Sequence, residues 1–155
     1  MWSAKKSVNF SIFVCLFLLL LLIILILFAP DIFQLYLTAY RGFNAGGEAL
    51  LNIKKIFCYC FYPCSVFAGI ILISLLKLLF NIKDQNIFIK ENVKLLRAIS
   101  WSCFAIAIIT FIGAFFYMPF IFVAAAGGFV GMLLRVLKNV MFAAVEISDE
   151  NELTI

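Results

Sequence analysis

The sequence predicts an all-α integral membrane protein that folds as a four-helix bundle with both termini in the cytoplasm. Of its 155 residues, 66% are hydrophobic and only 13% are charged. A soluble chain of this size could not cover so much apolar surface, because a folded surface still needs polar groups. The charged residues flank long apolar runs, and about 20 such residues are enough to cross a bilayer.

The first two spans are expected at residues 8–29 and 56–76. Residues 8–29 carry no charge and would form a helix about 33 Å long. A signal peptide is the competing interpretation, but its apolar core would be shorter. Lys77 ends the second span, and its stem can extend to the headgroups. Pro63 lies inside this span, where neighbouring groups can satisfy the freed carbonyl.

The third apolar run is too long for one span. Residues 98–134 contain no Asp, Glu, Lys or Arg. One helix of that length would reach about 55 Å, whereas the hydrocarbon core is about 30 Å thick. The chain is expected to turn back at Tyr117-Met118-Pro119, because proline disfavours helix at the preceding residue and tyrosine suits the interface. Spans three and four are therefore predicted at residues 98–117 and 120–137.

The distribution of lysine and arginine predicts the orientation. Cytoplasmic loops carry the excess of these residues, and nine fall on one side of the predicted spans against three on the other. The nine are Lys5, Lys6, Lys77, Lys83, Lys90, Lys94, Arg97, Arg135 and Lys138, and the three are Arg41, Lys54 and Lys55. Both termini and the inner connector, residues 77–97, are therefore expected in the cytoplasm.

The outer loop, residues 30–55, is expected to contain a short helix lying in the membrane interface. Polar residues recur at helical spacing in its first part, and the helix should end near Gly42. Gly46-Gly47 then predicts a break before the second span. An external ligand site in this loop stays an open alternative, but no residue type there selects a ligand.

The cytoplasmic segments differ in charge. In the inner connector, apolar spacing predicts a helix that starts at about Lys90 and runs into span three. After Ala144 the charge becomes negative, and residues 146–155 are expected to form a solvated acidic tail. Lys77, Arg135 and Lys138 are positioned to anchor the protein in lipid headgroups.

Small residues in span four predict close helix packing. Gly127 and Gly131 are four residues apart, and such stripes let helix backbones approach closely in lipid. Two interpretations remain open: packing inside the bundle, or a homodimer that uses this face.

The five cysteines do not define a disulfide scaffold or a metal site. Cys15 and Cys103 fall within spans and behave as small hydrophobic residues. Cys58, Cys60 and Cys64 lie close in sequence, but a tetrahedral site typically adds histidine and the chain has none. Packing is the expected role of these three, a redox role stays open, and no cofactor or metal is expected.

Neither catalysis nor direct nucleic-acid binding is expected. The carboxylates Asp149, Glu150 and Glu152 lie at the end of the chain, without a nucleophile, base or metal set nearby. The basic residues flank spans, whereas nucleic-acid binding needs them clustered on a soluble face.

Two segments resemble domain-of-unknown-function family 2975. They are Phe88-x-x-Glu91-Asn92-Val93-x-x-Leu96-Arg97, followed by a span, and the ending Glu150-Asn151-Glu152-Leu153-Thr154-Ile155. Ile87 departs from the proline often found there in the family, and Glu152 replaces the usual aspartate. The resemblance implies a small four-span protein of the bacterial cytoplasmic membrane, often encoded beside a Cro-type helix-turn-helix regulator.

These observations favour a regulatory or interaction protein that presents its inner connector and acidic tail to a cytosolic partner. The expected docking residues are Glu91, Asn92, Arg97, Glu150, Glu152, Leu153 and Ile155. The alternative is a small transporter, an export subunit or an oligomeric pore component. Coupled transport usually places ionisable groups within spans, and the predicted spans hold few.

Overall fold

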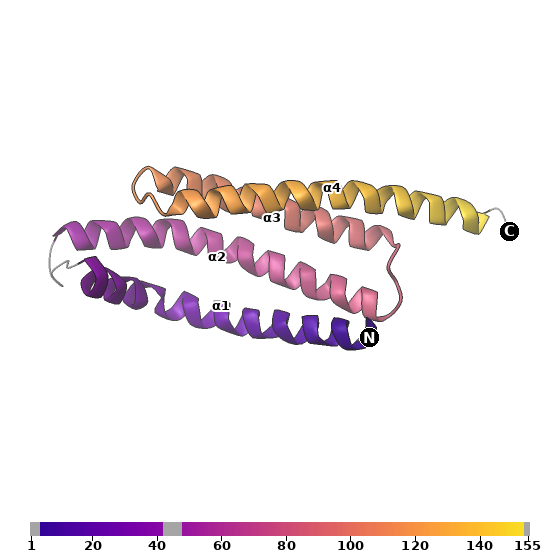
Figure 1. Ribbon diagram of the computed structural model, residues 1–155, viewed down its shortest axis with the longest axis horizontal. Coiled ribbons are helices and arrows are strands. Elements are labelled where there is room, and N and C mark those ends of the chain that lie inside the picture. The colour runs from indigo at the N-terminus through magenta and orange to yellow at the C-terminus, as the bar shows by residue number, and fades with distance from the viewer. Residues whose placement is uncertain (1–3, 42–47, 154–155) are drawn as a thin grey trace.

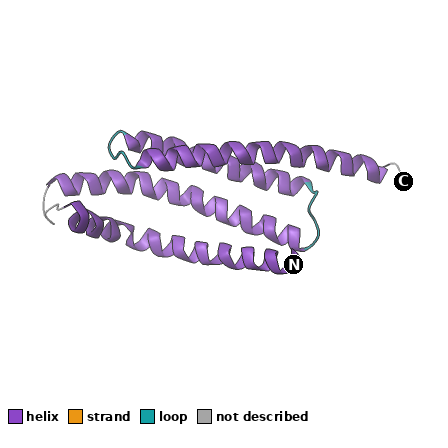
Figure 2. Ribbon diagram, in the orientation of Figure 1, coloured by secondary structure: helices purple, strands orange, loops and turns teal. Residues whose placement is uncertain are grey.

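The described part of the protein consists of four long helices. The computed structural model describes residues 4–41 and 48–153, and these residues form helices joined by short loops (Figures 1 and 2). The helices are α1 (Ala4–Arg41), α2 (Glu48–Lys83), α3 (Lys90–Ala114) and α4 (Phe120–Leu153). All four are long and apolar enough to cross a membrane. The all-α prediction with four membrane-competent helices is therefore confirmed.

The helices run alternately up and down, so their ends gather in two groups (Figure 1). One group holds the start of α1, the end of α2, the start of α3 and the end of α4; we call it the cationic end. The opposite group holds the turn between α3 and α4, and we call it the aromatic end. Both described chain ends, in α1 and α4, belong to the cationic end.

The helices form an open row rather than a closed bundle. Among the described residues, backbone packing is confined to chain neighbours: α1 on α2, α2 on α3, and α3 on α4. The four helices expected as a bundle are therefore arranged as a row of neighbouring pairs, and the surrounding lipid gives the physical reason. Lipid is as apolar as a leucine side chain, so no hydrophobic force drives α1 to close on α4. Large apolar side chains stay exposed accordingly, among them Phe13 at 67% and Phe122 at 75%.

Helix α1 continues through Pro30, beyond the expected end of the first span. Proline has no N–H, so one intrahelical bond is lost and the helix bends; Figure 1 shows α1 bent towards its C-terminal end. Ala29, Phe33 and Leu37 recur every four residues and are all buried. This stripe faces the interior on both sides of the proline, so packing maintains the helix.

An aromatic cluster joins α1, α2 and the α3–α4 turn at the aromatic end. The rings of Phe33 and Phe57 stack with centroids 3.9 Å apart, and the Tyr117 ring meets Phe33 edge-on at 5.8 Å. Phe120, the first residue of α4, stacks on Phe57 at 6.2 Å. Leu37 is fully buried against the same cluster. The side chains thus connect helices whose backbones do not touch.

The connecting segments lie close to their expected positions, although the helices are longer. The turn predicted at Tyr117-Met118-Pro119 falls in residues 115–119. The helix expected to start at about Lys90 is α3, which begins at Lys90. The predicted outer loop is mostly helix, because α1 extends to Arg41 and α2 starts at Glu48. The break predicted at Gly46-Gly47 lies outside the described residues. Residues 146–153, expected as a tail, continue α4 as helix.

Candidate functional site at the cationic end

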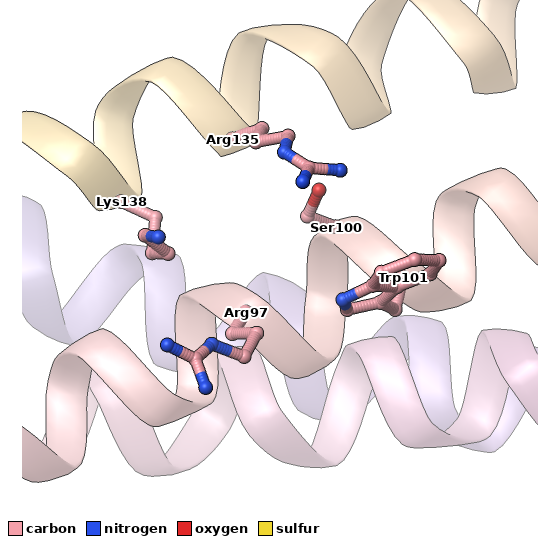
Figure 3. Close-up of a pocket in the computed structure, with 5 residues that line it drawn as sticks. All are labelled: Arg97, Ser100, Trp101, Arg135 and Lys138. Carbon is pink, nitrogen blue, oxygen red and sulfur yellow. The ribbon is translucent and has the colours of Figure 1, made fainter.

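A cationic groove opens between α3 and α4 near the cationic end. It is lined by Arg97, Ser100 and Trp101 of α3 and by Arg135 and Lys138 of α4, around a cavity of about 240 Å³. Figure 3 shows Arg135 and Lys138 on one helix and Arg97, Ser100 and Trp101 on the other, with the Arg135 guanidinium reaching towards Ser100 and Trp101. In sequence the two groups are far apart, and only the antiparallel pairing of α3 with α4 brings them together.

Two contacts fix the shape of the groove. The Ser100 hydroxyl donates a hydrogen bond of 2.8 Å to the Gly131 carbonyl oxygen, and Ser100 is buried. This bond ties the two helices together at the base of the groove and occupies the hydroxyl proton. The Arg135 guanidinium carbon lies 5.7 Å from the centroid of the Trp101 ring, within the range of a cation–π interaction.

The groove carries positive charge without a balancing carboxylate in its lining. Its ionisable residues are Arg97, Arg135 and Lys138, and no Asp or Glu lines it. An ion pair of 3.9 Å joins Lys54 to Asp31 at the aromatic end, away from the groove. Arginine presents a planar fork of donors that matches phosphate and carboxylate oxygens. The groove is therefore suited to bind an anion.

Gly127 and Gly131 lie in the interface between α3 and α4. A Cβ atom at Gly127 would be 3.3 Å from the Cys103 carbonyl oxygen, and one at Gly131 would be 3.3 Å from the Cys103 Cβ. Gly128, by contrast, faces open space. The small-residue stripe thus packs within the chain. Of the two interpretations left open by the sequence, the contacts of Gly127 and Gly131 favour packing inside the chain, because α3 covers this face.

Asn92 holds the loop between α2 and α3. Its side chain is fully buried and accepts a hydrogen bond of 2.7 Å from the Asn81 side-chain amide. Its own amide donates to the carbonyl oxygens of Asn86 and Ile87, both at 2.8 Å. This placement conflicts with the docking role expected for Asn92, because the side chain is inaccessible and its polar atoms are already bonded.

The end of α2 explains why the loop needs this support. Gln85 has a φ of 66°, in the left-handed region usually occupied by glycine. The Gln85 N–H bonds the Ile82 carbonyl oxygen and the Asn86 N–H bonds that of Asn81, which is the Schellman pattern of helix termination. A non-glycine residue there costs about 1 kcal/mol or more, and the Asn92 hydrogen bonds offset that strain.

The chain matches a known protein family over almost its whole length. A family model described as a protein of unknown function, DUF2975, matches residues 4–155. The chain belongs to the DUF2975 family. No curated protein and no solved structure matched it. The DUF2975 assignment confirms the resemblance carried by the connector and the ending, and it supplies no activity.

The structure separates the expected docking residues of this DUF2975 protein. Glu91 and Arg97 are exposed on α3, and Arg97 lines the cationic groove. Glu150 is exposed near the end of α4. Glu152 and Leu153 belong to the last turn of α4, and Ile155 lies outside the described residues. Lys77, expected at the headgroups, is exposed on α2, which continues beyond it to Lys83.

The cysteines of the DUF2975 chain are placed within helix interfaces or along α2. A Cβ atom on Gly113 would lie only 2.7 Å from the Cys60 sulfur, too close for two such atoms. The absence of a side chain at Gly113 therefore lets α3 approach α2. Cys15 donates to the Leu72 carbonyl oxygen at 3.4 Å and joins α1 to α2. Cys58, Cys60 and Cys64 are free thiols. Within the described ranges, no group of three His, Cys, Asp or Glu side chains could hold a metal.

Sequence reasoning missed the cationic groove as a unit. It assigned Arg97 to partner docking and Arg135 and Lys138 to headgroup anchoring, and it gave Trp101 no role. A signal was available in the sequence: Arg97, Ser100 and Trp101 share one helix face by their spacing, and so do Arg135 and Lys138. Folding span four back on span three can bring these two faces together.

Proposed function

We propose that this protein is a multi-pass protein of the bacterial cytoplasmic membrane that presents the end of α4 to a cytosolic protein partner. The observation that supports this proposal is the continuation of α4 as helix to Leu153. Figure 1 shows that α4 projects beyond the start of α3 at the cationic end. A helix that leaves its neighbours in this way offers its side chains to another molecule.

The helix contacts support a membrane position that leaves this projection in water. The Asn81–Asn92 bond aligns α2 with α3, and one to two turns further inward lie Lys77 on α2 and Arg97 on α3. From Arg97 to the turn at residue 115 the helix is about 27 Å long, close to the hydrocarbon thickness of about 30 Å. These cations would then mark one membrane surface.

The orientation follows from the same cations. The cationic end carries the large excess of lysine and arginine, and cytoplasmic surfaces hold that excess. Both termini then lie in the cytoplasm, and the end of α4 faces cytosolic proteins.

The chemistry of the projecting helix specifies the kind of partner. Glu146 and Glu150 are exposed one turn apart, and Ile147, at 60% exposure, lies beside them. Val140 continues the apolar face towards the membrane at 62% exposure. An acidic amphipathic helix fits an apolar groove with a basic rim. A Cro-type helix-turn-helix regulator, the partner implied by the family resemblance, is the specific candidate.

The test is co-purification of the regulator with the membrane protein. A chain truncated after Ser148 and a Glu146→Lys, Glu150→Lys variant should both lose the regulator, because they remove or reverse the acidic face. Glu91→Lys is the matched control: it reverses an exposed carboxylate at the same end, on α3. Undiminished binding by both α4 variants would refute the proposal, and selective loss with Glu91→Lys would place the docking surface on the connector.

A transporter, export subunit or pore component is the second candidate, with weaker support. Among the described residues the open row encloses no central channel, because α1 and α4 do not pack together. A pore would therefore need several copies. Purified protein that carries current across a planar bilayer would favour this alternative over the docking proposal.

A further inference from the structure

A second, apolar cavity lies along the same helix pair as the cationic groove. Beyond Trp101, the space between α3 and α4 is lined by Phe104, Ile108 and Phe111 on one side and by Ile121 and Ala125 on the other. This second cavity holds about 400 Å³. The α3 residues of the two cavities follow helical spacing on one face, so the charged and apolar parts lie in line.

We propose that this groove binds one anionic phospholipid, with its phosphate among Arg97, Arg135 and Lys138 and an acyl chain along Phe104, Ile108 and Phe111. Basic pockets between membrane helices bind anionic phospholipid headgroups in this way. The proposal concerns the α3–α4 groove alone and does not depend on whether α4 binds a partner.

The charges favour phosphate over a zwitterionic headgroup. Three cations line the headgroup part and no carboxylate lines it, so a choline or ethanolamine group would find no counter-charge there. The Ser100 proton is already donated to Gly131. Ser100 therefore shapes the site, and the arginine and lysine N–H groups supply the donors.

Trp101 lies at the junction between the two parts. Tryptophan suits this position, because its ring is apolar and its N–H can reach the polar headgroup layer. Arg135 lies over its ring, which holds the guanidinium at the top of the apolar groove. The arrangement matches a lipid at the point where its headgroup joins its chains.

The length of the groove fits one acyl chain. Trp101 and Phe111 are ten residues apart on α3, about 15 Å along a helix. That is half of a hydrocarbon core of about 30 Å, or the depth of one leaflet. A free inorganic phosphate would use the cationic part and would leave the apolar part without a role.

The proposal is tested with full-length protein in nanodiscs of phosphatidylcholine containing one-fifth phosphatidylglycerol, with retained lipid counted by native mass spectrometry. The wild type should keep one phosphatidylglycerol. Arg97→Gln with Arg135→Gln should bind it about twenty-five-fold more weakly, since each basic residue near an anionic surface contributes about a factor of five. Lys83→Gln with Lys94→Gln is the matched control, because it removes two exposed cations from the same end outside the groove.

A second pair of variants tests the apolar part. Ala125→Phe would fill the groove and should reduce retention, whereas Ala126→Phe, at the neighbouring exposed position outside the lining, should not. Thermal unfolding of each variant verifies that it remains folded. If the groove variant and the Lys83→Gln, Lys94→Gln control lose phosphatidylglycerol equally, the proposal is overturned in favour of general attraction between the basic surface and anionic lipid. Unchanged retention in Ala125→Phe, with inorganic phosphate displacing the lipid, would overturn it in favour of a simple anion site.

Discussion

Replacing Asn92 should destabilise the protein more than any other single polar substitution at the cationic end. Its fully buried side chain makes three hydrogen bonds, one with the Asn81 amide and two with the carbonyl oxygens of Asn86 and Ile87. Each such bond contributes about 0.5–1.5 kcal/mol net, and a buried group left without its partner costs about 1–3 kcal/mol. Asn92→Ala should therefore lower the free energy of unfolding by about 2–4 kcal/mol.

The measurement is reversible unfolding of purified protein in detergent micelles, followed by circular dichroism. Asn139→Ala provides the control, because Asn139 is exposed on α4 and its change should stay within about 0.5 kcal/mol. A double-mutant cycle that combines Asn92→Ala with Asn81→Ala isolates the hydrogen bond between these two side chains. Its coupling free energy should be about 1 kcal/mol. If Asn92→Ala unfolds at the same free energy as the wild type, the Asn92 hydrogen bonds do not stabilise the loop between α2 and α3. The reasoning from burial and hydrogen bonding then fails.

Substitutions at three further sites, Gly127, Gly113 and Phe33, test the packing, with Gly128→Ala and Cys60→Ala as comparisons. Gly127→Val should destabilise the α3–α4 pair by about 1–3 kcal/mol in the same unfolding assay, whereas Gly128→Ala, which faces open space, should be neutral or stabilising; equal effects would contradict the interface. Gly113→Ala should also cost about 1–3 kcal/mol, and adding Cys60→Ala should recover part of it, since the Cys60 sulfur occupies the space. Phe33→Ala should cost about 3–5 kcal/mol by opening a cavity in the aromatic cluster, and a loss below about 1 kcal/mol would show that the cluster contributes little.

The sequence predicted the helices well because their signals are local. Apolar runs of sufficient length and the Tyr117-Met118-Pro119 turn identify where helices lie and where the chain reverses. The ends were harder to predict, because polarity marks where a span leaves the membrane and says little about where a helix stops. Helix α1 continues through Pro30 and α4 continues to Leu153 for this reason.

The arrangement of the helices and the roles of polar residues depended on contacts distant in sequence. The helices are apolar on most faces, so the pattern could not distinguish an open row from a closed bundle. Asn92 looked available because its residue type is polar, but its partners Asn81 and Asn86 meet it only when the loop folds. Arg97 and Arg135 likewise form one groove only after α3 and α4 pair.

The order of helix contacts has a consequence for how the chain assembles during synthesis. Within the described residues each helix packs its backbone on the helix that precedes it, so every pairing can form as soon as the later helix enters the membrane. Contacts between chain neighbours keep the loss of loop entropy small and favour rapid folding. The contact between Phe33 and Tyr117 spans the first helix and the last turn. It can form only near the end of synthesis, when the first helix and the last hairpin are present together.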